Sequence, residues 1–393
     1  MSTPSSFLKM QEVIDARPLS RLQFQAISLC MLIAVLDGFD TQVIGMLAPV
    51  MSQSLGVPMA LFAPALSASL VGMLIGAFTL GPLADRYGRK RLIVISATMF
   101  GLGGALPNAI PLASEYSPKR LARTIVSTLV CGMPLGATLG GVISGVLLPV
   151  SGWQSVFVVG GTLPLIAALL SMSFMPESPE ILAQCVEKRE QLNSIVRRIA
   201  PDVDLASVEA RSVERPQRVP LRELFEQGRA VQSVLLWIPY FMNLVVLYFI
   251  VSWMPSMLVG AHQTVGTGIE AVTLFSIGGV VGCLRQGPLM NQFGVRRSML
   301  CQLLAYMLLA IVLANSADAA PLVIGVSFML GVAVQGVQGG LNALAAEIYP
   351  ARMRATGVGC AVGIGRVGSC AGPLAGAFCC NGTGQQARCF SPA

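Results

Sequence analysis

The stretch "GPLADRYGRKR" (residues 81–91) returns as "GPLMNQFGVRR" (residues 287–297) in the second half of the chain. Both copies have a Gly-Pro-Leu start, an aromatic residue, a glycine and paired basic residues in register. Two unrelated loops would seldom share all of these features, so the repetition predicts two duplicated halves. One copy alone is most simply a basic turn, whereas the repetition makes a gating loop an equally good interpretation.

A second repetition supports the duplication but has a different spacing. "EYSPKRLART" (residues 115–124) matches "EIYPARMRAT" (residues 347–356). The second pair lies about 26 residues farther apart than the first, which is the length of one helix with its turn. We therefore expect that about one helix is missing from the first half, near residue 100.

The composition is that of a membrane protein. The chain has 393 residues, 54% of them hydrophobic and 11% charged, with a mean hydropathy of +0.71. Such a chain is too apolar for a soluble domain with one core, which predicts an all-α membrane protein. The apolar stretches predict about ten transmembrane helices, over residues 22–50, 61–84, 92–114, 122–148, 153–175, 231–259, 269–290, 298–315, 321–346 and 355–380.

Polar segments divide the chain into parts. No cleavable secretory signal is expected, because the opening residues are polar and no apolar run precedes Leu22. In the second half only one helix follows the repeated "EIYPAR", so the last helix is also expected to be missing. The expected parts are a cytoplasmic amino-terminal tail (1–21), a first membrane half (22–175), a cytoplasmic central loop (176–230), a second membrane half (231–380) and an aberrant polar tail (381–393).

The basic residues predict which loops face the cytoplasm. The loops near 51–60, 149–152, 260–268 and 316–320 contain no Lys or Arg, so we expect them outside. The net charge of +7 is then explained by basic cytoplasmic loops, and no nucleic-acid partner is expected. Residues 92–118 are basic at both ends but are long enough for one crossing only. Either a helix is missing there or the segment does not cross.

The predicted gating loop combines glycines with charges. Gly81 and Gly88 allow a helix end to pass close to its neighbour, and Asp85 is placed to cap or pair near that end. Arg86 and Arg89 belong to the basic group that we expect at the anionic cytoplasmic surface.

Together with "LDGFDTQVIG", "GLGGALPNAI", "SEYSPKR", "MPESPE", "SWMPSML" and "GIGRVG", this repeated loop resembles the major facilitator superfamily. Within it, the chain is similar to the aromatic acid:proton symporter family, the branch of the 4-hydroxybenzoate transporters. The resemblance covers about residues 15–378. It implies a fold of two six-helix halves in the bacterial inner membrane and proton-coupled import of aromatic carboxylates. One departure is that "ISATMF" runs directly into "GLGGALPN", so the arginine that the family carries before its fourth-helix glycines is absent.

Two aspartates lie inside the first apolar stretch. Asp37 and Asp40 are one helical turn apart and face roughly the same way. If the helix enters at Leu22, Asp37 is roughly 22 Å into the membrane. A charge there is costly unless it is protonated, paired or hydrated, and two such acids titrate as a coupled pair. They are therefore candidates for carrying the proton, and the alternative is a structural capping role at a wet helix end.

Arg366 is the candidate for binding the substrate carboxylate. It lies roughly 17 Å from the cytoplasmic start of its helix, where an unpaired guanidinium is costly. Its planar fork suits a carboxylate, either that of the substrate or that of Asp37 or Asp40 when the site is empty. The alternative is a permanent structural ion pair. The resemblance also implies roles for these residues, because the family's first-helix acids fall on Asp37 and Asp40 and its eleventh-helix basic residue falls on Arg366.

The remaining polar residues have less specific interpretations. Salt bridges at matching helix ends are expected for Glu115 with Arg120 and for Glu347 with Arg352 and Arg354. Asn243, Trp253, Gln338 and Asn342 line a cavity or, alternatively, join helices.

The leading hypothesis is a monomeric proton-coupled symporter of an aromatic carboxylate in the lipid bilayer, with no metal or cofactor. The alternatives are a non-transporting remnant of such a transporter and a carrier of another substrate, such as a sugar, another organic acid or a drug. An enzyme is not expected, because no catalytic constellation is present.

Overall fold

The structure is a computed structural model that describes residues 14–15, 17–98, 105–184, 189–199, 225–226, 229–316, 319–349 and 354–382. The described residues form α-helices and one short 3₁₀ helix, without any strand. The chain divides into two compact units. The first comprises Met1–Asp37, Ile75–Gly132 and Gly161–Gln217, and the second comprises Gly38–Leu74, Met133–Gly160 and Arg218–Ala393.

Three long helices contribute to both units. They are α2 (Arg21–Leu55), α3 (Ala63–Tyr87), which follows the 3₁₀ helix η1 (Met59–Phe62), and α7 (Gly132–Phe174). The backbone of α7 is non-helical at Gly152, where φ is +73°. Glycine adopts this conformation without the steric cost that a Cβ would add. The break falls between the crossings predicted over 122–148 and 153–175, and it separates α7 into two helices.

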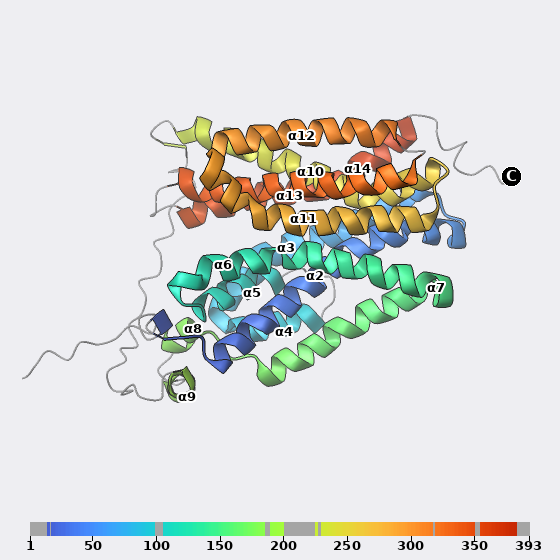
Figure 1. Cartoon of the computed structure of the whole chain (residues 1–393). Helices are drawn as coiled ribbons and strands as arrows, with labels where there is room; N and C mark the ends of the chain where they lie inside the picture. The colour runs from blue at the N-terminus through green and yellow to red at the C-terminus, as the bar shows by residue number, and fades with distance from the viewer. Residues whose placement is uncertain are drawn as a thin grey trace, which may run out of the picture. The chain divides into compact units, whose positions relative to one another are not determined.

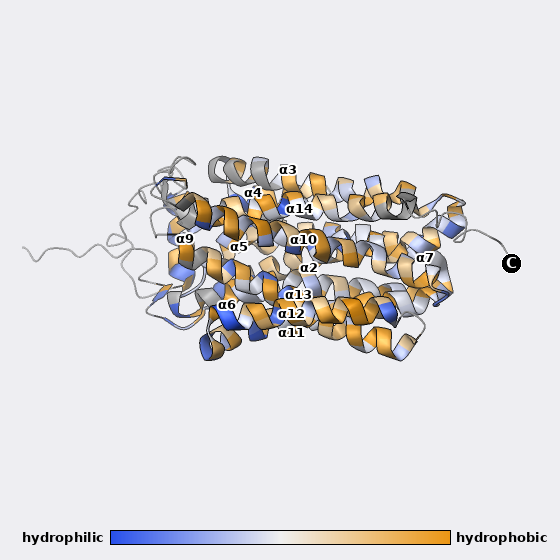
Figure 2. Cartoon of the chain, turned by 90° about the horizontal axis from the view of Figure 1, so that it is seen from above, coloured by the Kyte–Doolittle hydropathy of each residue, from blue (hydrophilic) through white to orange (hydrophobic). Residues whose placement is uncertain are grey.

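Most described helices are long and apolar enough to span a bilayer. Seven segments in the described part of the chain meet that criterion, and one of them, Thr124–Phe174, contains the break at Gly152. Hydrophobic residues cover most of each long helix, with hydrophilic residues mainly near the helix ends (Figure 2). Such helices satisfy their own backbone hydrogen bonds, as a hydrocarbon solvent demands.

Residues 92–114 do not form the single crossing helix that we expected. The structure has two short helices there, α4 (Arg89–Thr98) and α5 (Ala105–Glu115), which pack against each other in the first unit. Arg89 begins α4 and Glu115 ends α5, and an ion pair of 2.7 Å joins them. The two helices are therefore antiparallel. Each is about 15 Å long, which is only half the thickness of a hydrocarbon layer of about 30 Å. This agrees with the alternative that the segment does not cross.

The first unit contains three further helices. They are α6 (Lys119–Val130), α8 (Pro179–Gln184) and α9 (Arg189–Ile199). In α9 the buried residues Leu192, Ile195, Val196 and Ile199 recur every three or four positions, so they form one face of the helix. Arg197 and Arg198 occupy its last turn, where positive charge is favourable.

The second unit contains five consecutive long helices that lie side by side (Figure 1). They are α10 (Arg229–Gly260), α11 (Val265–Phe293), α12 (Val295–Asn315), α13 (Ala320–Ile348) and α14 (Arg354–Gly382). Glycines allow close backbone approach, because a Cβ at Gly368 or Gly372 of α14 would meet backbone atoms of Phe241 or Val245 in α10. Small residues of this kind are typical of packed membrane helices.

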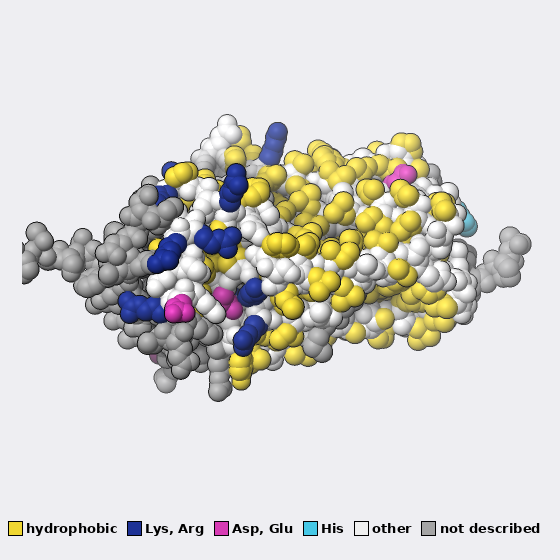
Figure 3. All heavy atoms as spheres, turned by 90° about the horizontal axis from the view of Figure 1, so that it is seen from below, with side chains coloured by type: hydrophobic (Ala, Val, Ile, Leu, Met, Phe, Trp, Pro, Cys, Tyr) yellow, Lys and Arg dark blue, Asp and Glu magenta, His cyan; other side chains and the backbone are white. Residues whose placement is uncertain are grey.

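The surface also fits a bilayer. Along α12 the large apolar side chains of Leu300, Leu304, Met307, Leu308 and Ile311 are exposed. On the face shown in Figure 3, Lys and Arg side chains gather toward one end and hydrophobic side chains cover much of the remainder. A row of large exposed apolar side chains along a whole helix is typical of a surface that contacts lipid.

Candidate functional site

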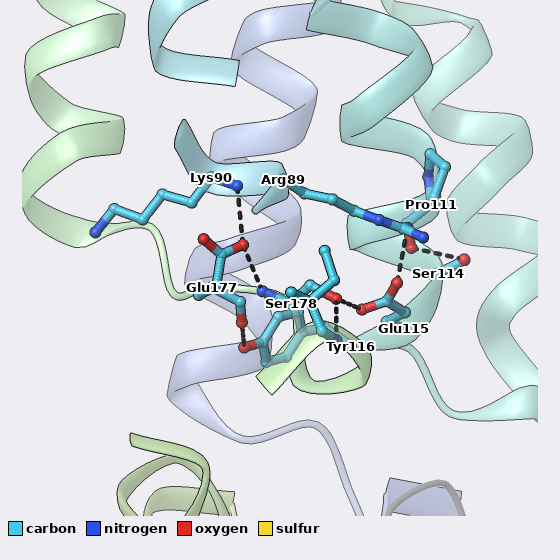
Figure 4. Close-up of polar contacts among 9 residues, drawn as sticks. Arg89, Lys90, Pro111, Ser114, Glu115, Tyr116, Glu177 and Ser178 are labelled. Carbon is cyan, nitrogen blue, oxygen red and sulfur yellow. Dashed lines mark hydrogen bonds and ion pairs between the residues drawn. The ribbon is translucent and has the colours of Figure 1, made fainter. Parts of the chain in front are cut away.

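The first candidate site is a cluster of polar contacts in the first unit, which we call the loop cluster (Figure 4). It consists of Arg89, Lys90, Glu115, Tyr116, Glu177 and Ser178. One carboxylate oxygen of Glu115 pairs with Arg89 Nη1 at 2.7 Å, and the other accepts a hydrogen bond from the Ser178 hydroxyl. The side chains of Arg89 and Glu115 are only 14% and 13% exposed, so this ion pair is largely shielded from water.

Glu177 binds the other end of the loop cluster. Its Oε1 accepts hydrogen bonds from the backbone amides of Lys90 and Ser178, each at 3.0 Å. Its backbone carbonyl accepts a 2.6 Å hydrogen bond from the Tyr116 hydroxyl. These hydrogen bonds thus connect three segments, which are the loop after α3, the end of α5 and the residues before α8.

Helix caps orient two of these segments. Ser178 is the cap of α8, because its hydroxyl accepts a hydrogen bond from the Ile181 amide at 3.2 Å. Ser20 and Gln23 form a reciprocal capping box at the start of α2. Gln23 also donates from Nε2 to the Tyr116 carbonyl at 2.8 Å, which ties α2 to the loop cluster.

Gly88 fits the loop cluster for two reasons. Its φ of +105° lies in a region that side chains with a Cβ rarely adopt. A Cβ at this position would also collide with the Glu177 carboxylate. The repeated glycine of the loop is therefore required where the chain turns from α3 into α4.

Tyr116 is fully buried between α5 and α6. Burial raises the pKa of its phenol well above the usual range, and the negative charges of Glu115 and Glu177 raise that pKa further. The phenol is therefore protonated at any physiological pH and remains a hydrogen-bond donor.

The loop cluster includes only some of the predicted loop residues. Arg89 belongs to it and Gly88 directly precedes it, whereas the burial and contacts of Gly81, Asp85 and Arg86 lie outside what the structure describes. The ion pair that the structure gives Glu115 is with Arg89. Arg120, the partner expected from sequence, donates to the Arg17 carbonyl at 3.0 Å. Arg352 and the side chains of Glu347 and Arg354 lie outside the described residues.

Sequence reasoning missed Glu177, Ser178 and Tyr116. The signal for the first two was present, because "MPESPE" interrupts an apolar run with two prolines and two acids. Tyr116 follows Glu115 directly in "SEYSPKR" but carries no charge pattern that would identify it.

The second candidate site is a group of polar residues in the second unit, which we call the bundle site. It consists of Tyr240 and Asn243 on α10, Gln338 and Asn342 on α13, and Arg366 on α14. Asn243 donates from Nδ2 to Gln338 Oε1 at 2.9 Å, and the Tyr240 hydroxyl donates to Asn342 Oδ1. The predicted cavity residues Asn243, Gln338 and Asn342 are thus brought together by two helices.

Arg366 is half-buried, and its Nη1 contacts the Met73 sulfur of α3. Next to Arg366, Gly365 packs directly against the Tyr240 ring. Arg366 therefore belongs to the same region of the second unit as the hydrogen-bonded amides of Asn243 and Gln338.

Trp253 has a different role from the other three predicted cavity residues. It is fully buried, and its Nε1 donates to the Pro373 carbonyl of α14 at 2.9 Å. The indole N–H, which would be costly to leave unpaired in an apolar interior, thereby has a partner. Trp253 therefore joins α10 to α14.

Asp37 and Asp40 are both half-buried on α2, one turn apart as expected. Asp37 belongs to the first unit and Asp40 to the second, where Arg366 also lies. Each makes polar or electrostatic interactions within the protein.

The long apolar helices of the described chain define a membrane protein that crosses the bilayer several times. The sequence profile of the Major Facilitator Superfamily matches residues 30–107 and 99–373. The chain belongs to the Major Facilitator Superfamily. This membership confirms the resemblance and the expected fold class, and because it is a family of transporters it also confirms that the protein is not an enzyme.

Named relatives cover nearly the whole chain. The chain is 34% identical to the 4-hydroxybenzoate transporter PcaK of Pseudomonas putida over 399 residues, which cover 94% of this chain and 89% of the relative. It is 33% identical to a gallate transporter of the same species, covering 94% of this chain and 88% of the relative. Because 94% of 393 residues is fewer than 399, the first alignment contains positions of the relative without a counterpart here.

Solved structures show the same fold. The inward open conformation of the xylose transporter XylE from E. coli matches with a TM-score of 0.72 at 17% identity, over 91% of this chain and 90% of that chain. A crystal structure of a D-xylose-proton symporter matches with a TM-score of 0.69 at 15% identity, over 90% of each chain.

Proposed function

We propose that the protein is a proton-coupled symporter that imports an aromatic carboxylate, such as 4-hydroxybenzoate or protocatechuate, across a bacterial inner membrane. The observation that carries this proposal is the 34% identity with the 4-hydroxybenzoate transporter of Pseudomonas putida along nearly the whole chain. Transport is by alternating access, the protein acts as a monomer, and its amino terminus is cytoplasmic, in agreement with the basic loops.

Arg366 binds the substrate carboxylate in this proposal. The contact that the structure gives its guanidinium is the Met73 thioether, which is a weak acceptor. A carboxylate accepts two charge-assisted hydrogen bonds from the same fork and is a much better partner. Replacing the thioether contact with the carboxylate contact therefore favours substrate binding.

Asp37 and Asp40 carry the proton. Both lie on the apolar helix α2. A carboxylate in such a helix loses its charge when it takes up a proton, which is how an acid in a membrane segment takes part in proton transport. Because they are adjacent on one helix face, they titrate as a pair and no single acid is assigned the proton.

The hairpin α4–α5 is re-entrant, with both of its ends on the cytoplasmic side. It occupies the place where the full family fold has two crossings, after an internal loss of about one helix. The two profile matches support this proposal, because they overlap at residues 99–107, which run from the end of α4 into the first turn of α5.

A second candidate is a non-transporting remnant of such a carrier, and the same hairpin favours it. Labelled 4-hydroxybenzoate uptake, normalised to membrane-inserted protein, separates the two when measured beside a version with the lost residues rebuilt. Uptake by both versions supports the symporter. Uptake by the rebuilt version alone makes this chain the remnant, and uptake by neither refutes the aromatic substrate.

A further inference from the structure

One buried acceptor in the bundle site has no partner in the structure. Asn243 is 5% exposed on α10. Its Nδ2 donates to Gln338 Oε1 at 2.9 Å and to the Val334 carbonyl at 3.5 Å. Among the described residues its Oδ1 has no hydrogen-bond partner, although it is buried.

The direction of the Asn243 amide follows from its neighbours. A backbone carbonyl can only accept a hydrogen bond, so the atom that faces Val334 must be the amide nitrogen. The oxygen is therefore the group left over. A buried acceptor without a donor is costly, which makes it a place where a ligand donor gains affinity.

This acceptor lies close to the residue that we propose for the substrate carboxylate. Asn243 is one helical turn from Tyr240 on α10, and the Tyr240 ring packs against Gly365, the residue next to Arg366. A cationic carboxylate binder and an orphan acceptor in one region match the two polar ends of a hydroxylated benzoate.

We propose that Asn243 Oδ1 accepts a hydrogen bond from the ring hydroxyl of the substrate and thereby selects hydroxylated over unhydroxylated aromatic carboxylates. Gln338 holds the Asn243 amide in the required direction. The inference rests on the proposed function and adds its specificity determinant. A benzoate without the hydroxyl leaves Oδ1 unpaired, and a site built to pair a substrate hydroxyl rejects an analogue that lacks it.

The test measures equilibrium binding of three ligands to the purified full chain, namely 4-hydroxybenzoate, benzoate and 4-methoxybenzoate. The methoxy compound has the same ring oxygen but cannot donate. We expect the unsubstituted and methoxy compounds to bind at least about tenfold more weakly than 4-hydroxybenzoate. Equal affinity for all three overturns the inference. If none of the three ligands binds, the proposed function is refuted as well. The two failures are therefore distinguishable.

The variant Asn243→Ala removes the acceptor. We expect it to weaken 4-hydroxybenzoate binding about tenfold and to change benzoate binding less than about threefold, so that the preference is lost. Asn315→Ala, at the exposed end of α12, is the matched control and keeps the preference. An Asn243→Ala protein that stays folded and still prefers 4-hydroxybenzoate overturns the inference, since Asn243 then only joins α10 to α13. If that variant does not fold, the three-ligand series on the unaltered chain still decides.

Discussion

Arg89, the first residue of α4, and Glu115, the last residue of α5, form an ion pair of 2.7 Å that joins the two ends of a helical hairpin. The pair is reinforced by Ser178, which donates to the same carboxylate. It holds together the two ends of a segment that is basic at both ends and too short for two crossings.

The hairpin predicts the accessibility of Arg120, an exposed residue in α6 just after the hairpin. In a cysteine-free background, Arg120→Cys is expected to resist a membrane-impermeant maleimide in intact cells and to react after permeabilisation. His262→Cys, in the exposed turn between α10 and α11, is the control and is expected to react from outside. Labelling of Arg120→Cys in intact cells would show that the segment crosses.

Loss of one partner of the Arg89–Glu115 pair is expected to destabilise the protein. Glu115→Gln leaves a largely buried guanidinium without its counter-charge, at a cost on the order of 1–3 kcal/mol. The measurement is thermal unfolding in detergent. The exchanged pair Arg89→Glu with Glu115→Arg is expected to recover part of the loss. Glu190→Gln, at an exposed position of α9, is the control and is expected to change stability by less than about 0.5 kcal/mol. An unchanged melting temperature for Glu115→Gln would contradict the role of the pair.

Tyr116 predicts how stability depends on alkaline pH. Because burial raises the pKa of its phenol above the unfolded value of about 10, the folded state holds this proton more tightly. Its contribution is complete below about pH 10 and is lost as the pH rises further. Tyr116→Phe is expected to cost about 1 kcal/mol near neutral pH through the lost hydrogen bond to Glu177 and to reduce the alkaline loss. Unfolding curves from pH 7 to 11 that are parallel for the two proteins would refute this.

Gly88→Ala is expected to destabilise the protein at the loop cluster by about 1–3 kcal/mol. Alanine would be held at an unfavourable positive φ, and its Cβ would collide with the Glu177 carboxylate. Gly287→Ala is the matched control, because a Cβ there meets no atom and alanine favours the helix interior. Chemical unfolding of both variants gives the comparison. Equal stability of the two would mean that the turn adjusts freely.

Much of the fold could be predicted because hydrophobic length and basic loops are local signals. The repeated loop drew attention to Gly88 and Arg89, but Arg89 was expected at the anionic membrane surface and instead pairs with Glu115. The partners could not be predicted in the same way, since Arg89, Glu115 and Glu177 meet only when three segments fold together. Glu115 was assigned to Arg120 because both lie at the same helix end, whereas the structure has an ion pair between Glu115 and Arg89 on another helix.

The bundle site shows a similar limit. Asn243, Gln338 and Asn342 were expected to act together, and the structure pairs them through α10 and α13. Trp253 could not be separated from them by sequence, because an indole N–H serves a ligand or a backbone carbonyl equally well. Met73 was missed as a contact of Arg366 because a thioether in an apolar helix resembles any other hydrophobic residue.

The two aspartates give the most direct test of the central claim, which is proton-coupled transport of an aromatic carboxylate. The measurement is uptake of labelled 4-hydroxybenzoate into proteoliposomes with an imposed pH gradient, for the unaltered chain and for Asp37→Asn with Asp40→Asn. We predict that the unaltered chain accumulates substrate, that a protonophore abolishes the accumulation, and that the double variant accumulates none. Accumulation that persists with the protonophore or in the double variant would contradict the claim.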